Sequence, residues 1–153
     1  TLPPECDLSA LEASGMPRTV EVRWAEQAIM LSKAAVLGDY ASFDKILAAD
    51  NPRRAKALGR SVAPWDQARW DGAVCAIALA VVTQKFQSDP RLGAVLLRTG
   101  TCVLAEMTSR DCCWGTGVDI GGADEHRPER WPGTNILGWA LMRARDGLRG
   151  VAL

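Results

Sequence analysis

The spacing of apolar residues predicts a mostly helical chain. Between residues 66 and 87, apolar side chains recur every three or four positions, the spacing of one helix face. Residues 25–37 contain neither glycine nor proline, are rich in helix-forming residues and stop at Gly38. Asn51 and Pro52 form a helix-start signal, with the asparagine as the cap. By the same criteria we expect helices over residues 25–37, 41–49, 52–59, 66–87, 90–97 and 135–148.

Two short segments have the pattern of β-strands. Residues 19–24 alternate apolar and polar positions, and residues 102–107 form a second candidate. We therefore expect a small sheet that contains residues 20–22 and 103–105. The predicted fold class is α+β: one mostly helical domain over residues 1–153, with a small β-sheet.

Composition narrows the classes of function. The chain has 153 residues, of which 18 are basic and 18 acidic, so its formal net charge is zero. That balance argues against a protein that holds nucleic acid mainly through phosphate contacts. Five cysteines without a C-x-x-C pair, and a single histidine, predict no metal site. We expect reduced thiols and a cytoplasmic location, with no secretion signal at the start of the sequence. The most apolar stretch, residues 73–82, is too short to cross a membrane.

One lysine stands out on the first predicted helix. Glu26 and Lys33 are seven residues apart, so they share a helix face about two turns apart. The helix is otherwise strongly apolar, and a lysine there either extends its amine to water or lies in a site. In a site, partial burial would lower the pKa of the Lys33 amine and make it a nucleophile.

A long glycine-rich segment, residues 108–134, has little helical or strand pattern. Loops of this length inside a compact domain are usually functional or disordered. Trp114 lies within it, in the stretch Asp111-Cys-Cys-Trp-Gly. Tryptophan is more often a core residue, but on a polar loop its face could stack on a planar base.

Ordered motifs along nearly the whole chain resemble those of the NADAR family, also called YbiA-like. Each motif alone is a weak signal, and it is their order that makes the resemblance specific. In order, they are Ala25-Glu-Gln-Ala-Ile-Met-Leu-Ser-Lys-Ala, Ala57-Leu-Gly-Arg60, Trp70, Lys85-Phe-Gln, Leu96-Leu-Arg-Thr-Gly100 with Val103-Leu-Ala-Glu106, Asp111-Cys-Cys-Trp-Gly115, and Trp131-Pro-Gly-Thr-Asn-Ile-Leu-Gly138 with Leu141-Met-Arg-Ala-Arg145.

The resemblance implies N-glycosidase chemistry without a cofactor or metal. Lys33 is similar in position to a lysine that captures the sugar as a Schiff base, while Glu26 or Asp111 would move protons. Trp114 would stack on the base, and Asn135, at a helix start, would hold a phosphate or hydroxyl group. The remaining implied substrate-binding residues are Trp70, Glu106 and Arg60.

The family resemblance leaves the substrate open. One branch hydrolyses phosphoribosylamino-pyrimidine intermediates of riboflavin synthesis and releases ribose 5-phosphate, and the motifs here resemble it more closely. A second branch removes ADP-ribose from guanine bases, and only there would nucleic acid be a partner. A third possibility is a nucleotide-binding or ADP-ribose-binding module without turnover. It is suggested by Leu8-Ser-Ala-Leu11, where the family has aromatic-x-Ser-Asn-Phe. A second departure, Val22 in place of an aromatic residue, bears on the identity of the substrate.

Overall fold

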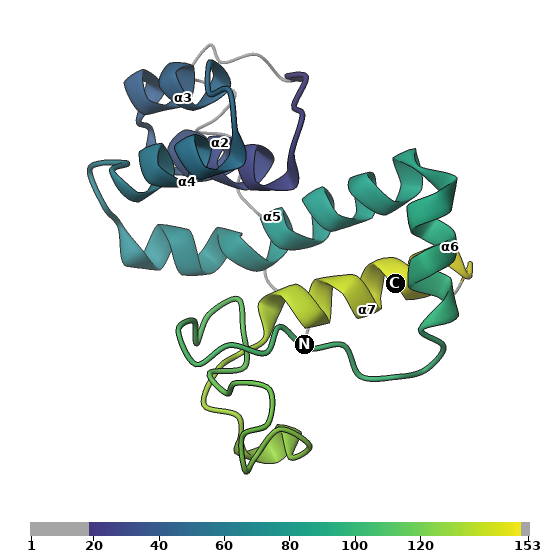
Figure 1. Ribbon diagram of the computed structural model, residues 1–153. Coiled ribbons are helices and arrows are strands. Elements are labelled where there is room, and N and C mark those ends of the chain that lie inside the picture. Colours follow the sequence, from purple (N-terminus) through teal and green to yellow (C-terminus); the bar gives the residue numbers. More distant parts are fainter. Residues whose placement is uncertain (1–18, 151–153) are drawn as a thin grey trace. The chain divides into compact units, whose positions relative to one another are not determined.

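The computed structural model describes residues 19–150, and these residues form helices joined by loops (Figure 1). Each predicted helix is confirmed, with its ends within two residues of the expected ones. The segment Leu8–Leu11, whose motif departs from the family pattern, lies outside the described residues. The elements are α2 (Ala25–Leu37), α3 (Tyr40–Leu47), α4 (Pro52–Arg60), α5 (Gln67–Ser88), α6 (Pro90–Arg98), a 3₁₀ helix η1 (Pro128–Arg130) and α7 (Ile136–Leu148).

The chain divides into two compact units, one ending at Ile77 and the other beginning at Ala78. Helix α5 begins in the first unit and ends in the second. The prediction of a single domain over residues 1–153 stays a prediction.

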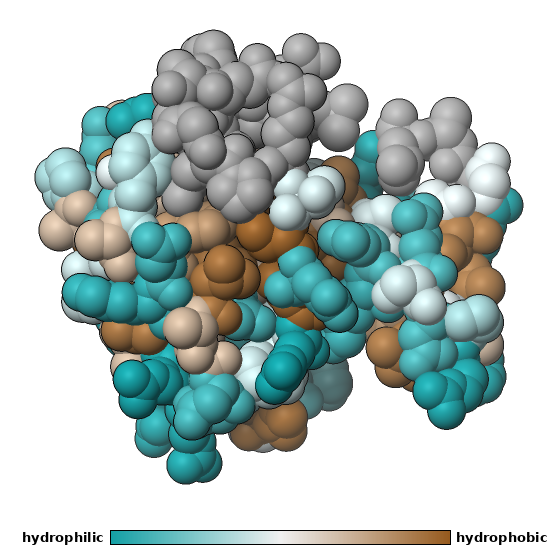
Figure 2. All heavy atoms as spheres, turned by 90° about the horizontal axis from the view of Figure 1, so that it is seen from above, coloured by the Kyte–Doolittle hydropathy of each residue, from teal (hydrophilic) through white to brown (hydrophobic). Residues whose placement is uncertain are grey.

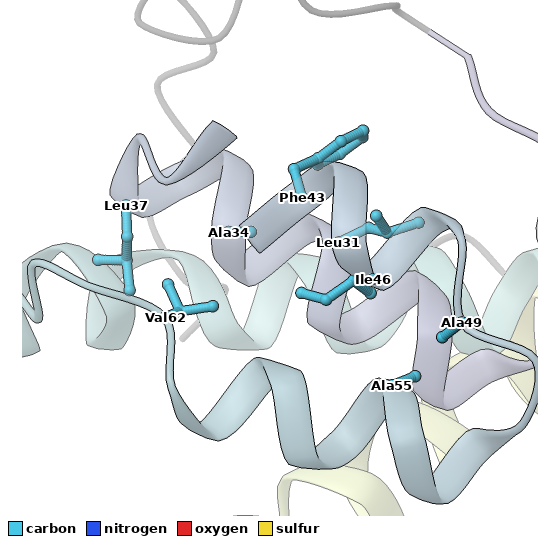
Figure 3. Close-up of a cluster of buried hydrophobic side chains, with 8 residues drawn as sticks. All are labelled: Leu31, Ala34, Leu37, Phe43, Ile46, Ala49, Ala55 and Val62. Atoms are coloured by element: carbon cyan, nitrogen blue, oxygen red, sulfur yellow. The ribbon is translucent and has the colours of Figure 1, made fainter. Parts of the chain in front are cut away.

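Three helices build the core of the first unit. The buried positions of α2 recur every three or four residues and pack against α3 and α4. Figure 3 shows the cluster, in which Ile46 of α3 is fully buried and Leu31 of α2 is nearly so. Burial of each large aliphatic side chain contributes roughly 1.5–3 kcal/mol to folding. The members are Leu31, Ala34, Leu37, Phe43, Ile46, Ala49, Ala55 and Val62.

Capping residues set the helix ends in this unit. Gly38 ends α2 in the left-handed conformation, with φ of 75°, which glycine adopts without a steric penalty. Asp39 then caps α3 by accepting from the Ser42 N–H, and its second oxygen accepts from the Ala63 N–H at 3.0 Å. Asn51 caps α4 as predicted, accepting from the Arg54 N–H at 2.9 Å. Local signals therefore account for where these helices begin and end.

The predicted β-sheet is wrong: none of residues 19–150 lies in a strand. Residues 103–105 have no regular secondary structure, and a side chain rather than a neighbouring strand bonds to the backbone of residues 104 and 106. The Asn135 amide donates to the Leu104 carbonyl at 2.9 Å and accepts from the Glu106 N–H at 3.0 Å. Residues 20–22 lead directly into α2, where the Arg23 N–H is bound by the side chain of Gln27. In the described chain no second strand pairs with either segment, so neither forms a sheet.

In the second unit, α6 packs against α7, and a buried arginine ties the following loop to α7. Arg145 of α7 is 4% exposed and donates to the Thr99 hydroxyl and the Cys102 carbonyl, both at 2.9 Å. Residues 112–115 also bind the start of α7, because their carbonyls accept hydrogen bonds from the backbone N–H groups of residues 134–137.

Among residues 19–150, no helix has the length and apolar character needed to cross a membrane. On the face that Figure 2 shows, hydrophilic side chains are interspersed with hydrophobic ones.

Candidate active site

The Lys33 amine lies between a backbone carbonyl and two indole rings. Its Nζ donates to the Gly59 carbonyl oxygen at 2.8 Å. The same atom lies 4.6 Å from the ring centroid of Trp65 and 5.7 Å from that of Trp70. Burial lowers the pKa of the Lys33 amine below its ordinary value of 10.5. The burial, which lowers the pKa, fits the requirement for an amine that is neutral part of the time.

Packing between α2 and α4 explains how Lys33 reaches Gly59. A side chain at Gly59 would meet Met30, one turn before Lys33, with a Cβ to Sδ distance of 2.0 Å. Glycine at this position therefore lets α4 lie close to α2 and brings its carbonyl within reach of the lysine. The Ala-Leu-Gly-Arg motif has a physical purpose here that is independent of any ligand.

The two tryptophans differ in burial. Trp70, in the first turn of α5, is 7% exposed and belongs to the core, whereas Trp65 precedes the helix and is 47% exposed. Their ring centroids are 6.3 Å apart, with the planes inclined at 49°. Trp65 was not among the predicted site residues. Its only sequence signal is its place just before Asp66, which caps α5 by accepting from the Arg69 N–H.

Two other predicted residues of the first unit lie apart from the amine. Glu26 forms a surface ion pair with Lys56, the Nζ to Oε2 distance being 3.8 Å. Seven residues along a helix correspond to a rise of about 10 Å, so Glu26 and Lys33 share a face without touching. Arg60 follows Gly59 in α4 and is exposed.

In the second unit, Asp111 organises the turn that carries Trp114. Its Oδ1 accepts from the N–H groups of Cys113 and Trp114, both at 2.8 Å. The Trp114 side chain is half-buried, and the side chain of Glu106 is exposed. The D-x-x-W spacing thus produces a side-chain-stabilised turn that fixes the backbone beneath the tryptophan.

Asn135 is engaged within the protein. It adopts a left-handed conformation, with φ of 50°, and its amide is occupied by Leu104 and Glu106. The next two N–H groups of α7, of residues 136 and 137, donate to the carbonyls of Cys113 and Trp114. The groups expected to hold a phosphate or hydroxyl group therefore have partners from the protein itself, and they join the turn at Trp114 to α7.

Five of the eight predicted site residues accordingly form two local groups. Lys33 and Trp70 are together in the first unit. Asp111, Trp114 and Asn135 are linked in the second by the hydrogen bonds just described.

Two further features of the described residues bear on the chemistry. No group of three or more His, Cys, Asp or Glu side chains in residues 19–150 is arranged to hold a metal ion. A cavity of about 420 Å³ lies in the first unit and contains none of the predicted site residues. Its lining consists of Glu21, Arg23, Gln27, Leu47, Ala48, Ala49 and Asp50.

The structure defines a class of helical protein in which a half-buried lysine amine lies against aromatic rings. The chain belongs to the NADAR domain family, whose profile matches residues 5–149 and so includes both units. This match confirms the resemblance drawn from the ordered motifs.

Three relatives give the family a chemical context. The chain is 34% identical to an N-glycosidase of Acanthamoeba polyphaga mimivirus over 122 residues, covering 80% of this chain and 72% of that protein. It is 32% identical to an N-glycosidase of Nostoc punctiforme over 133 residues, covering 87% and 75% respectively. It is 30% identical to a riboflavin biosynthesis protein of Vibrio vulnificus over 106 residues, covering 69% of this chain and 26% of that protein.

Proposed function

We propose that this protein is a hydrolase of N-glycosyl bonds that uses Lys33 as its nucleophile. Family membership and the two relatives named N-glycosidases support the reaction class. The observation that carries the assignment of Lys33 is its environment: half-buried, bound to the Gly59 carbonyl and without a carboxylate at ion-pair distance among the described residues. A solvated surface lysine would have no reason for its lowered pKa.

The reaction begins with the neutral Lys33 amine. Its lone pair attacks the anomeric carbon as the glycosidic C–N bond breaks, and the bonding pair leaves with the base nitrogen. That nitrogen takes a proton from Glu26 or Asp111. The sugar ring then opens to a Schiff base, which water hydrolyses to free sugar and the original lysine. The bonds that Asp111 makes to the backbone use Oδ1, so we assign proton transfer to Oδ2.

The remaining predicted residues bind and position the substrate. Trp114 stacks on the base, and Glu106 and Arg60, both exposed, contribute polar contacts. Trp70 supports the amine from the core side. Asn135 acts through the backbone of the Trp114 turn, because its amide is held by the protein.

We propose a small phosphoribosylamino-pyrimidine or a related nucleotide as the substrate, with ribose 5-phosphate as the released sugar. The motifs that resemble the riboflavin branch support this choice, as does the Vibrio vulnificus relative with its riboflavin name. A cytoplasmic location is part of the proposal, supported by the free thiols of Cys75, Cys102 and Cys112.

A release assay tests the substrate. Purified protein is incubated with phosphoribosylamino-pyrimidines, nucleosides, nucleotides and ADP-ribosylated guanine, and free reducing sugar is measured. We expect release from the phosphoribosylamino-pyrimidines. Release from ADP-ribosylated guanine alone would contradict the proposed substrate and identify ADP-ribosylated guanine in its place. Saturable binding by calorimetry without any release would favour a binding module over an enzyme.

Glu26→Gln should lower kcat by about 10²- to 10⁴-fold, the usual contribution of a general acid or base, with little change in KM. The substitution removes a proton carrier but preserves the shape of the side chain. Steady-state kinetics with the best substrate of the panel measure both constants. Lys56→Met is the matched control, because it breaks the same ion pair and leaves the carboxyl group in place. Equal losses in both variants would assign Glu26 a structural role.

A further inference from the structure

Trp65 is exposed yet held in one orientation. Nearly half of its surface is accessible, and its indole N–H donates to the Gln67 side chain at 3.1 Å. The Gln67 amide in turn donates to Asp71 at 2.7 Å. Burial does not account for this ring, because its neighbour Trp70 fills the core position.

The ring of Trp65 lies against the Lys33 amine. The Nζ is 4.6 Å from its centroid and 5.7 Å from that of Trp70, and the two ring planes are inclined by 49°. Two inclined indole faces around one nitrogen form part of an aromatic cage. Such faces carry a partial negative charge and favour a cation over a neutral group.

We propose that Trp65 is a catalytic residue that stabilises the positive charge that forms at the Lys33 nitrogen during the reaction. The proposal rests on the proposed function, since it requires Lys33 to be the nucleophile. The amine is neutral before attack, and the bond to the sugar gives the same nitrogen a positive charge as an iminium ion. An interaction that is stronger in the charged state than in the neutral one lowers the barrier.

The charge can be followed through the covalent step. The Nζ lone pair forms the bond to the anomeric carbon, and the glycosidic bonding pair leaves with the base nitrogen, which is protonated. Loss of a proton from Nζ and protonation of the ring oxygen open the sugar, leaving a C=N bond with its positive charge on Nζ. Water then adds to this carbon, and elimination restores the amine.

This role predicts a characteristic dependence on pH. Well below the pKa of Lys33, the resting group is already an ammonium ion, and Trp65 stabilises the ground state and the iminium equally. Above that pKa the ground-state amine is neutral and gains nothing from Trp65. The ring then stabilises only the charged transition state, so its full effect increases the rate. The effect of removing the aromatic face should therefore grow as pH rises.

Most of the charged groups named on the surrounding elements have partners of their own. Glu26, on the same helix, pairs with Lys56 of α4. At the start of α5, Asp66 accepts from the Arg69 N–H, and Asp71 accepts from the Gln67 amide. The other charged side chain of α4 beside Gly59 is the exposed Arg60. None of these groups forms an ion pair with the Lys33 amine in the described chain.

The test compares Trp65→Phe with Trp65→Leu. Both variants lose the indole hydrogen bond, but only phenylalanine keeps an aromatic face. Each protein, with Lys33→Arg as the control, is incubated with ribose 5-phosphate and cyanoborohydride over a range of pH. The aldehyde condenses with the amine and releases water, and hydride reduces the C=N bond to a stable amine. Mass spectrometry of the peptide that contains Lys33 gives the rate of adduct formation.

We expect the Phe to Leu rate ratio to be close to one at low pH and to rise to about five- to tenfold above the pKa of Lys33. A fluorinated tryptophan at position 65 keeps the shape of the ring and weakens its negative face. The fluorinated protein should react more slowly than wild type in the same pH range. This measurement tests the proposal even if Trp65→Leu does not fold.

Two results would overturn the proposal, and they are distinguishable. Equal rates for Trp65→Phe and Trp65→Leu at every pH, with the fluorinated protein matching wild type, would remove Trp65 from the chemistry and leave Lys33 as the nucleophile. Absence of any Lys33 adduct in the wild-type protein, while substrate is still hydrolysed, would refute the covalent function and the role of Trp65 with it.

Discussion

Lys33→Arg should reduce sugar release by about 10⁴-fold or more, on the order of the loss when an enzyme is deprived of its nucleophile. Arginine keeps the positive charge and much of the length, but its guanidinium does not lose a proton in proteins and forms no imine. The measurement is kcat/KM with the best substrate of the release assay. Borohydride added during turnover should trap a sugar on Lys33 in the wild-type protein and nothing in the variant.

Lys85→Arg is the matched control. Lys85 also lies near an aromatic ring, with its Nζ 5.7 Å from the centroid of Phe86, but it is exposed in α5. We expect its kinetics to equal those of the wild type. Wild-type activity in Lys33→Arg, without an adduct in either protein, would favour direct attack by water with Glu26 or Asp111 as the base.

The lowered pKa of Lys33 also determines how activity and stability respond to pH. Activity should rise with pH with a midpoint below 10.5, because attack needs the neutral amine. Between the lowered pKa and 10.5, the unfolded chain binds more protons at this residue than the folded one. The contribution of Lys33 to folding stability therefore increases as pH rises through that interval.

Gly138→Ala should destabilise the fold by about 3 kcal/mol, because overpacking against rigid backbone is costly. A Cβ at this position would lie 2.1 Å from the Leu104 carbonyl oxygen and 2.3 Å from the Asn135 amide nitrogen. The alanine would force apart the hydrogen bonds that hold residues 104–106 against the start of α7. Denaturant unfolding followed by circular dichroism measures the change in free energy of unfolding.

Gly72→Ala is the control for this substitution. Gly72 lies inside α5, and apart from its chain neighbours and the backbone of its own helix no atom of the described residues is within 4 Å of the Cβ that alanine would add. Alanine there should stabilise the protein by roughly 0.5–1 kcal/mol through helix propensity. Opposite signs for the two alanines would establish that the effect at Gly138 comes from its contacts. A Gly138→Ala protein as stable as wild type would contradict this prediction, because it would show that the Asn135 side chain and the Leu104 backbone can move away at little cost in free energy.

The sequence by itself determined the helices and the family. Gly38 ends one helix, and Asn51 with Pro52 begins another, through interactions that span only three or four residues. Such local signals act wherever the chain goes, so they can be recognised without tertiary information. Lys33 stood out for a similar reason, since an apolar helix makes a charged residue conspicuous.

Only the tertiary structure decided which residues, distant in the sequence, contact each other. Residues 103–105 have the pattern of a strand, yet their hydrogen-bonding partner is a side chain 31 positions after Leu104. The amide of Asn135, expected to bind substrate, is used in that contact. Trp65, an unassigned tryptophan in the sequence, lies against the amine of a lysine 32 positions earlier. Partners so far apart carry no local signal, because they come together only when the helices pack and bury their apolar faces.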